Sequence, residues 1–331
     1  MKRLKELYEI HSPSKNESHL KEYLKKWIDT IPDCEYTEDW YGNMYITKGL
    51  SETYPCVVAH LDQVQTKHSD DFKAMESDGV IFGFSKKNKR QEGLGADDKN
   101  GIWIAMQCLE KYDAIKVAFF VAEEIGCVGS SSADVSFFMD CRFIIEPDRK
   151  GSSDLITSIF TDICSDEFIN SIPFDEYGYK EQNGMLTDVA VLSESGVGLS
   201  CLNISCGYYN PHSDEEFTII DDLLNCFNLI CWIIENCQDV YYHTPKVKSY
   251  SNRYYSGYDY YGITDTSRTP VNVIDCIYEV MDNNPDLYPE DIWDLLDKEV
   301  RKKITYQEFS QIAYDYWYEY YLNDTDEKIE K

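Results

Sequence analysis

The sequence predicts an α/β fold in which a mixed, largely parallel sheet lies between two layers of helices. Short apolar segments with strand character alternate with amphipathic segments of helical periodicity over most of the first 240 residues. Strands that alternate with helices in this way form largely parallel sheets. An apolar fraction of 43% and an aromatic fraction of 14% are ample for a buried core. We therefore expect a three-layer α/β/α arrangement.

The individual elements follow from periodicity and turn residues. Strands are predicted over residues 56–59, 117–122, 143–145, 156–160 and 199–204. Helices are predicted over residues 99–112, 162–171, 187–195 and 219–237. The first 30 residues are also expected to be helical, with Ser14 and Glu17 forming a capping box. Aromatic and β-branched residues on both sides of Gly42 predict a hairpin over residues 36–48.

The composition changes after residue 245, which predicts three parts. Residues 1–245 form the main domain, and residues 246–270, rich in Tyr and Ser, form a linker or surface loop. Helical periodicity returns over residues 271–282, 289–300 and 305–322, so residues 271–331 are expected to form an acidic helical appendage.

Charge and cysteine content restrict the class of protein. Thirty-one basic and sixty acidic residues give a net charge of -29, which repels phosphates and argues against nucleic acid or membrane as the partner. The opening residues MKRLKELYEI lack the apolar core of a signal peptide, and no stretch is long and apolar enough to span a bilayer. Twelve cysteines without CxxC spacing indicate buried thiols rather than disulfides. We therefore expect a cytoplasmic protein.

Histidine and acidic residues stand at the ends of predicted strands. His60 and Asp62 follow the strand over residues 56–59, and in such a pair the histidine can bind a metal while the aspartate holds its other ring nitrogen. Asp97 and Asp98 lie between glycines just before a helix. That pair suits helix capping, and it equally suits a carboxylate that gives one oxygen to each of two cations. The carboxyl ends of strands in an α/β sheet meet at one crevice, so these groups are expected to converge.

Further acidic residues and a second histidine extend this pattern. Glu123 and Glu124 follow the strand over residues 117–122, and adjacent carboxylates repel each other unless positive charge lies nearby. One glutamate would bind a metal while the other acts as a general base. Asp148 follows the strand over residues 143–145, and His212 follows the strand over residues 199–204. Singly, each could be a turn or surface residue, but five such features in succession favour a metal site.

The segments HLD, GADDKNG, AEEIG, EPD and GYYNPH, in this order, resemble the metal-binding motifs of the cocatalytic di-zinc exopeptidase superfamily. That superfamily includes peptidase T, glutamate carboxypeptidase and bacterial leucyl aminopeptidase. The resemblance spans roughly residues 1–240 and implies that residues 1–245 are the catalytic domain of a metallopeptidase, a hydrolase of amide bonds.

The resemblance also implies a role for each matched residue. Asp97 would bridge two divalent metal ions, most suitably Zn²⁺, with Co²⁺ or Mn²⁺ as substitutes. One site would be completed by His60 and Asp148, the other by Glu124 and His212. Asp62 would orient His60, and Glu123 would take a proton from the water bridging the ions and return it to the leaving amine. In this superfamily the peptide bond between the two adjacent acids tends to be cis.

Two intervals between the implied ligands are short. The 64 residues from Asp148 to His212 cannot hold the separate lid domain of peptidase T and the carboxypeptidases in addition to the core. The 37 residues from His60 to Asp97 cannot hold the insertion of the tetrahedral aminopeptidases. The sequence therefore predicts a lid-less core similar to the single-domain leucyl aminopeptidases.

An aminopeptidase acting on short peptides is the leading interpretation. An N-acyl amino acid amidohydrolase or a carboxypeptidase would use the same chemistry, and an inactive scaffold protein on a hydrolase fold is a third possibility. An acidic group beside the metals would receive an N-terminal amine, whereas a basic group would suit a carboxylate. Asp188 lies in a segment similar to one near the substrate pocket of the superfamily, and it is either a pocket residue or a helix N-cap. The sequence leaves a homo-oligomer open.

Overall fold

The computed structural model describes residues 1–159 and 161–245 and, beyond them, residues 277, 280–281, 292–293, 295–296, 298–302, 304, 306, 309–310 and 312–313. The chain divides into two compact units, Met1–Lys248 and Ser249–Lys331. In the second unit, α10 (Lys298–Arg301) belongs to a small apolar core made of Ile277, Met281, Ile292, Leu296, Val300, Phe309 and Ala313. The predicted linker over residues 246–270 lies outside the described residues, as does much of the three predicted C-terminal helices.

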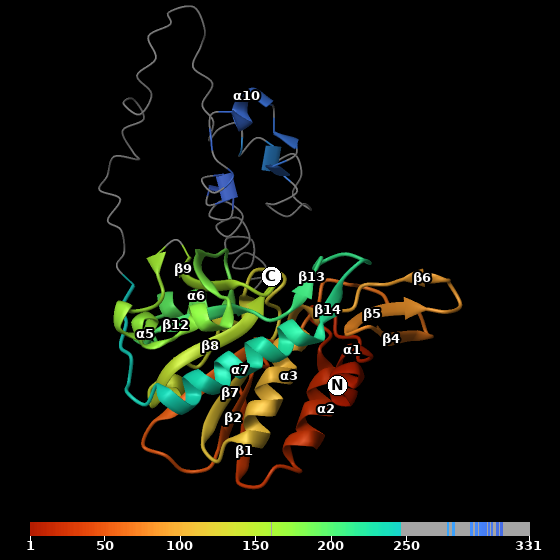
Figure 1. The fold of residues 1–331 in the computed structure, drawn as a ribbon. Coiled ribbons are helices and arrows are strands. Elements are labelled where there is room, and N and C mark those ends of the chain that lie inside the picture. The colour runs from red at the N-terminus through yellow and green to blue at the C-terminus, as the bar shows by residue number, and fades with distance from the viewer. Residues whose placement is uncertain are drawn as a thin grey trace, which may run out of the picture. The chain divides into compact units, whose positions relative to one another are not determined.

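A mixed sheet of nine strands forms the centre of the first unit (Figure 1). Its order is β1-β2-β7-β3-β8-β12-β9-β10, with β11 beside β9. The bounds are β1 (Cys34–Glu38), β2 (Met44–Lys48), β3 (Tyr54–His60), β7 (Ile115–Phe120), β8 (Cys141–Arg149), β9 (Asp154–Ile159), β10 (Thr161–Asp162), β11 (Lys180–Asn183) and β12 (Cys201–Ser205). The four central strands β7, β3, β8 and β12 run parallel, so their carboxyl ends lie at one edge.

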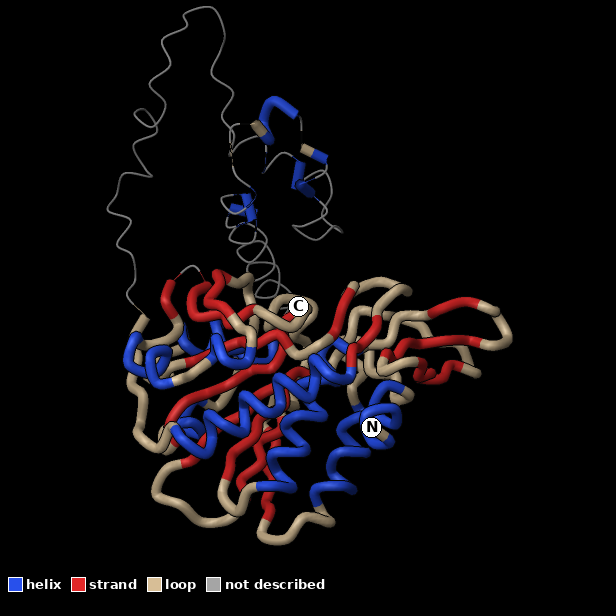
Figure 2. Tube along the Cα trace, viewed as in Figure 1, coloured by secondary structure: helices blue, strands red, loops and turns tan. Residues whose placement is uncertain are grey.

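Helices cover both faces of this sheet, which confirms the predicted fold class. The bounds are α1 (Lys2–Tyr8), α2 (Ser18–Ile28), α3 (Ala96–Lys111), α4 (Val128–Ser131), α5 (Asp166–Ser171), α6 (Asp188–Glu194) and α7 (Ile220–Asn236), with 3-10 turns η1 (Val135–Phe138) and η2 (Phe174–Tyr177). Side chains alternate along β3, so Val57 and Ala59 join the core under α1, α2, α3 and α7, while Cys56 and Val58 join the core under α6. Figure 2 shows α3 and α7 lying in front of the strands.

The long helices form because their apolar residues recur at helical spacing. One side of α7 is apolar and buried, and it carries Leu223, Cys226, Ile230 and Ile233. Two acidic residues, Asp221 and Asp222, lie in the first turn, where negative charge is favoured. Removing a side chain the size of Ile or Leu from water contributes about 1.5–3 kcal/mol. The apolar face therefore stabilises α7 far more than its intrinsic propensity does.

A second, smaller sheet was not predicted. It consists of β13 (Tyr208–Tyr209), β14 (Phe217–Ile219), β5 (Val80–Ser85) and β4 (Phe72–Ser77), with β6 (Arg90–Gln91) paired to β5. It joins the segment after β3 to the segment that carries His212, through pairs such as Phe217 with Phe82. The interval of 37 positions from His60 to Asp97 thus forms a hairpin extension and contains no separate domain.

The described residues between Asp148 and His212 (149–159 and 161–211) also form no separate lid domain. β9, β10, β11 and β12 all belong to the central sheet, and α6 packs against β8 and β12. The first unit therefore has the lid-less core that the interval lengths predict.

The predicted capping role of Ser14 is wrong. Helix α2 begins after Glu17 with no side-chain hydrogen bond at its N-cap. The hydroxyl of Ser14 instead donates to Asp62 Oδ2 at 2.7 Å. Glu17 turns inward and accepts from the N–H groups of Lys15, at 2.9 Å, and Ala122, at 3.3 Å. Ser14 therefore contacts the loop after β3, and Glu17 contacts the loop after β7.

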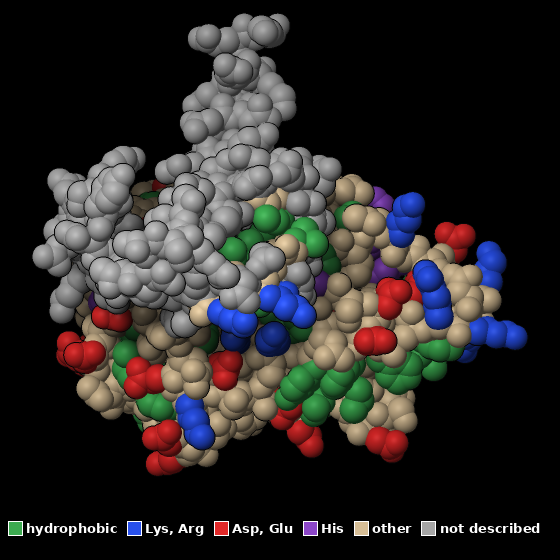
Figure 3. Space-filling model, turned by 90° about the horizontal axis from the view of Figure 1, so that it is seen from above, with side chains coloured by type: hydrophobic (Ala, Val, Ile, Leu, Met, Phe, Trp, Pro, Cys, Tyr) green, Lys and Arg blue, Asp and Glu red, His purple; other side chains and the backbone are tan. Residues whose placement is uncertain are grey.

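On the face seen in Figure 3, Asp and Glu side chains are scattered among other groups. The eleven cysteines of the described residues are free thiols, and ten of them are buried. Within the same part of the chain, no helix combines the length and apolarity that crossing a bilayer requires.

Candidate metal centre

His60 is the last residue of β3, a strand whose seven residues are all buried. Its Nδ1 lies 3.1 Å from the backbone carbonyl oxygen of Asp62 and 3.5 Å from Asp62 Oδ1. A carbonyl oxygen can only accept, so Nδ1 carries a proton and Nε2 points to the other side of the ring. Asp62 thus orients His60 mainly through its main chain.

The carboxylate of Asp62 connects two loops. Its Oδ1 accepts the backbone N–H of Glu123 at 2.9 Å, and its Oδ2 accepts that of Glu124 at 3.2 Å and the hydroxyl of Ser14. Burial raises the pKa of Asp62, but these hydrogen bonds and His60 outweigh it and hold the pKa below its ordinary value. The loop after β3 therefore fixes the position of the two glutamates after β7.

Asp97 and Asp98 face opposite directions at the start of α3. The peptide bond between them is cis, as the resemblance implies. Asp97 places Oδ1 3.0 Å from His60 Nε2 and Oδ2 3.4 Å from His212 Nε2. Asp98 is fully buried and accepts the backbone N–H groups of His60, at 3.3 Å, and Gly101, at 2.9 Å. Asp97 thus belongs to the site, while Asp98 stabilises the loop behind it.

The side chains of Glu123 and Glu124 also have different neighbours. Glu124 Oε2 lies 3.1 Å from His212 Nε2, and its Oε1 is buried without a hydrogen-bond partner among the described residues. Glu123 lies further back, with Oε2 4.0 Å from His60 Nε2 and Oε1 accepting from the thiol of Cys127 at 3.3 Å. One glutamate therefore touches a histidine ring and the other stands behind it.

Asp148 and His212 come from β8 and from the turn after β13. Because β8 continues to Arg149, Asp148 lies within the strand and not beyond its end. Its Oδ1 is 3.8 Å from His60 Nε2 and accepts from the hydroxyl of Tyr208 at 3.1 Å. His212 has a left-handed backbone (φ 62°) and its side chain is 46% exposed, whereas that of His60 is fully buried.

These five side chains form two groups that share Asp97. The first contains His60, Asp97 and Asp148, the second Asp97, Glu124 and His212, and within each group the ligand atoms lie within 4.8 Å of one another. Ligand atoms about 2.0–2.1 Å from a tetrahedral zinc ion are about 3.3 Å apart. The observed separations from His60 Nε2 and His212 Nε2, between 3.0 and 3.8 Å, are close to that value. The donor set of two imidazoles and three carboxylates fits divalent cations.

The electrostatics of the centre favour added positive charge. Burial, with Asp97 next in size, raises the pKa of Glu124 to about 8 and that of Asp148 to about 6. Burial opposes charging of His212, but Asp97 and Glu124 outweigh it and raise its pKa to about 12. Asp148, Asp62 and Asp97 likewise raise the pKa of His60. The acids around the two Nε2 atoms thus favour positive charge at the positions where cations would bind.

Glu216 is a residue of this region that sequence reasoning missed. It is fully buried, and its two carboxylate oxygens accept the backbone N–H groups of Asp97, at 3.1 Å, and Gly95, at 2.6 Å. Burial, with Asp97 adding, raises its pKa to about 7. The sequence around Glu216, EEF, shows no recognisable motif, because the residue acts through a hydrogen bond to Asp97, 119 positions away.

Two further buried acids lie beside the centre. Thr187 is the N-cap residue of α6, and Asp188 is its first residue, fully buried with neither carboxylate oxygen hydrogen-bonded within the described part of the chain. The hydroxyl of Ser130, which lowers the pKa of Asp188, donates to the carbonyl of Cys127 at 3.0 Å. Burial raises the pKa of Asp188 to about 7. Glu146, also buried, accepts from the hydroxyl of Thr187, and its Oε1 has no hydrogen-bond partner in the part of the chain that the structure describes. Burial raises the pKa of Glu146.

Comparison with known proteins identifies the fold. No family model and no curated protein matches the sequence. Among solved structures, the chain is similar to the aminopeptidase PepT from Bacillus cereus, with a TM-score of 0.57 and 15% identity over 71% of this chain and 97% of that one. A tripeptidase from Staphylococcus aureus gives 0.57 and 15% over 70% and 96%. An aminopeptidase from the archaeon Desulfurococcus kamchatkensis gives 0.52 and 16% over 70% and 93%. At this identity the likeness shows the fold, and it is the fold that the motifs led us to expect.

Proposed function

We propose that the chain is a metal-dependent aminopeptidase that removes residues from the free N-terminus of short peptides. The observation that carries this proposal is the position of Asp97, whose two oxygens face two histidines in two ligand groups. A carboxylate in this position can hold two cations side by side. The peptidases with a similar fold support the same class of reaction.

The residues would divide the work as follows. Two divalent cations, when bound, supply Lewis acidity that polarises a carbonyl and lowers the pKa of water. His60 and Asp148 would hold one cation, Glu124 and His212 the other, and Asp97 both. Glu123 Oε2, directed toward His60 Nε2 at 4.0 Å, would take a proton from the attacking water and deliver it to the nitrogen of the leaving amine. Asp62 would hold Glu123 in place through its backbone N–H.

Charge next to the centre supports a free amine as the recognised group. Asp188 and Glu146 are buried acids, and Oδ1 and Oδ2 of Asp188 and Oε1 of Glu146 have no hydrogen-bond partner among the described residues. An ammonium group beside them would find acceptors and would favour their charged forms. Arg149, the basic residue that follows Asp148, is paired with Asp154 at 3.3 Å. A cationic N-terminus suits this environment better than the carboxylate that a carboxypeptidase or an N-acyl amino acid amidohydrolase must bind.

A substrate panel tests the proposal. Purified full-length protein, supplied with zinc, cobalt or manganese, is assayed on aminoacyl anilides, short peptides and their N-acetylated counterparts. We expect turnover of the free-amine compounds and little or none of the blocked ones. Cleavage restricted to blocked substrates would instead identify an N-acyl amino acid amidohydrolase, and removal of C-terminal residues would identify a carboxypeptidase.

Metal analysis distinguishes the proposed enzyme from an inactive scaffold protein. An inactive protein on a hydrolase fold needs no cations, so purified protein would hold none after dialysis against zinc and repeated washing. We expect two divalent ions per chain, with the count falling when Asp97 is replaced by Ala, because that residue belongs to both groups. A zinc content of zero in wild-type protein would reject the proposed function.

A further inference from the structure

The loop after β7 folds back on itself and brings Cys127 onto Glu123. The N–H groups of Gly126 and Cys127 both donate to the carbonyl of Glu123, at 2.8 and 2.7 Å, and the N–H of Val128 donates to the carbonyl of Ala122 at 3.1 Å. Ala122 and Cys127 have left-handed backbones, with φ of 56° and 53°. The turn is therefore closed by its own main chain.

Cys127 occupies a conformation that disfavours its own side chain. A left-handed backbone is uncommon for residues other than glycine, asparagine and aspartate, because Cβ crowds the following carbonyl. Glycine would adopt it without cost, but glycine carries no donor. Glycine at position 127 would thus relieve the backbone strain and would remove the donor to Glu123 Oε1.

The thiol of Cys127 contacts the predicted general base. Its Sγ donates to Glu123 Oε1 at 3.3 Å, and the residue is 1% exposed. Burial, with Glu123 and Asp188 next, raises the pKa of the thiol well above its ordinary value, so it remains a protonated donor. With Oε1 held by sulfur, Oε2 is the oxygen directed toward His60.

We propose that Cys127 is a positioning residue, whose S–H group fixes the carboxylate plane of Glu123 so that one oxygen faces the two ligand groups. This inference rests on the proposed function of Glu123 as the base. A thiol suits the position because it is a weak donor and a poor ligand while protonated, so it orients the carboxylate without competing for cations. The alternative interpretation is that Cys127 acts only as a small apolar side chain that fills space in the core, as buried cysteines often do.

Kinetic measurements on three variants distinguish a residue that positions Glu123 from one that only fills space. Cys127→Ala removes the donor, Cys127→Ser keeps a hydroxyl donor, and Cys108→Ala is the control, because Cys108 is equally buried but lies near the far end of α3. We expect Cys127→Ala to lower kcat roughly 5- to 20-fold with KM and metal content unchanged, and Cys127→Ser to recover most of the loss. The acid limb of kcat/KM should move to higher pH in Cys127→Ala, because a carboxylate that loses a donor has a higher pKa.

A spectroscopic measurement tests the hydrogen bond without any turnover. The S–H stretching band lies in an infrared window that other protein groups leave clear, and subtracting the spectrum of Cys127→Ala isolates the band of this thiol. We expect the band to move to higher frequency when Glu123 is replaced by Ala, since the acceptor is lost.

The outcomes are distinct. A band that stays in place in Glu123→Ala, or equal kcat for Cys127→Ala and Cys108→Ala, overturns the inference. Equal losses in the Ala and Ser variants would also overturn it, because a donor would then not be the requirement. An inactive wild-type protein would refute the proposed function and with it this role, whereas an active wild type with no effect at Cys127 refutes the positioning role alone.

Discussion

Asp62 accepts the backbone N–H of Glu123 through Oδ1 at 2.9 Å, which ties the loop after β3 to the loop after β7. These two strands are parallel neighbours, so the hydrogen bond spans the edge where their carboxyl ends meet. The same carboxylate accepts the N–H of Glu124 through its other oxygen. A single side chain thus fixes the positions of both glutamates relative to His60 at the end of β3.

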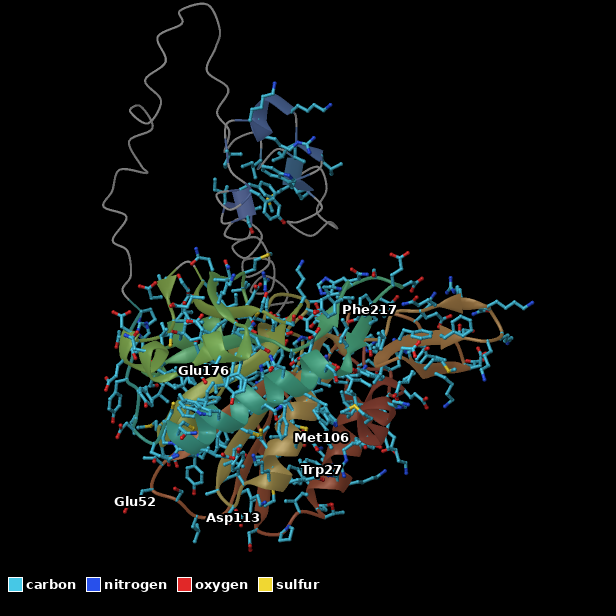
Figure 4. The ribbon with its side chains drawn as sticks, viewed as in Figure 1. Trp27, Glu52, Met106, Asp113, Glu176 and Phe217 are labelled. Atoms are coloured by element: carbon cyan, nitrogen blue, oxygen red, sulfur yellow. The ribbon has the colours of Figure 1, made fainter. Side chains whose placement is uncertain are left out.

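We expect Asp62→Asn to impair the centre without unfolding the protein. An amide presents one acceptor oxygen where the carboxylate presents two, so one of the two glutamate N–H groups loses its partner. Such supporting changes lower metal affinity or activity by about 10- to 100-fold. Asp113→Asn is the control, since Asp113 is exposed and lies at the opposite end of the sheet in Figure 4. The expectation fails if kcat/KM and zinc affinity are the same in both variants.

Glu123→Gln should abolish turnover while leaving the cations bound. Removing a general base lowers kcat by about 10²- to 10⁴-fold, and the side chain lies behind the ligand groups and does not belong to them. Glu124→Gln should instead lose metal, because Glu124 Oε2 faces His212 Nε2 at 3.1 Å. Rate measurements paired with metal analysis decide the matter. Metal loss in the first variant and retention in the second would reverse the two roles.

Zinc should stabilise the first unit against heat. A cation that binds only the folded state at 100 times its dissociation constant adds about 2.7 kcal/mol, which corresponds to a rise in Tm of roughly 5–10 °C for a unit of this size. Differential scanning calorimetry of chelated and zinc-loaded protein measures the shift. His212→Ala should reduce it and Asp97→Ala should remove it, in keeping with their membership of one and of both groups. An undiminished shift in Asp97→Ala would place the stabilising ion elsewhere.

His68 should make the protein less stable in mild acid. Burial, with Lys99 and His11 adding, lowers its pKa to about 3, against about 6.5 in an unfolded chain. The unfolded chain therefore takes up this proton first, so the free energy of unfolding falls as the pH drops below 6.5 toward 3 and is unaffected above 6.5. Between pH 7 and pH 5 the loss from this residue is about 2 kcal/mol.

A matched pair of variants isolates this contribution. His68→Gln keeps an amide that can donate to the carbonyl of Gly93, as the ring does at 2.8 Å, but cannot titrate. Urea denaturation at the two pH values should show a smaller acid loss in this variant by about 2 kcal/mol. His19→Gln, at an exposed position of α2, should follow the wild type. Parallel curves for all three proteins would contradict the assignment to His68.

Gly101→Ala should be destabilising although it lies in a helix. Alanine in a helix interior is ordinarily more stable than glycine by roughly 0.5–1 kcal/mol. At this position a Cβ would meet both carboxylate oxygens of Asp98, which accepts the N–H groups of Gly101 and His60. Displacing that carboxylate should cost at least about 1 kcal/mol in unfolding free energy and lower kcat/KM through His60. A more stable variant would show that the loop adjusts freely.

The main elements of the first unit could be predicted because their periodicity is local. The strand predicted over residues 117–122 is β7, and the helix predicted over 219–237 is α7, each shifted by one or two residues at its ends. The small sheet could not be predicted in this way. β4 and β5 are short and contain Lys73 and Gly83, and β13 and β14 have two and three residues, so none has a pattern of its own.

The sequence could predict only those residues of the candidate centre that stand at or near the ends of predicted strands. His60, Asp97, Glu124, Asp148 and His212 stand at or beside the edge where parallel strands finish, and the structure brings them together. Ser14 has the pattern of a helix cap, and what decides its real partner is Asp62, 48 positions away. Glu216 depends in the same way on a contact with Asp97, 119 positions away. Roles that arise from tertiary contacts alone require coordinates.

The two histidines differ in their access to water, and this has a kinetic consequence. His60 is sealed within the unit, while nearly half of the His212 side chain meets solvent. An ion held beside His212 should therefore exchange with the medium much faster than one held beside His60. Preparations made in mixed salts would then contain hybrid centres, with the slow position keeping the first metal it met and the fast one reporting the current buffer.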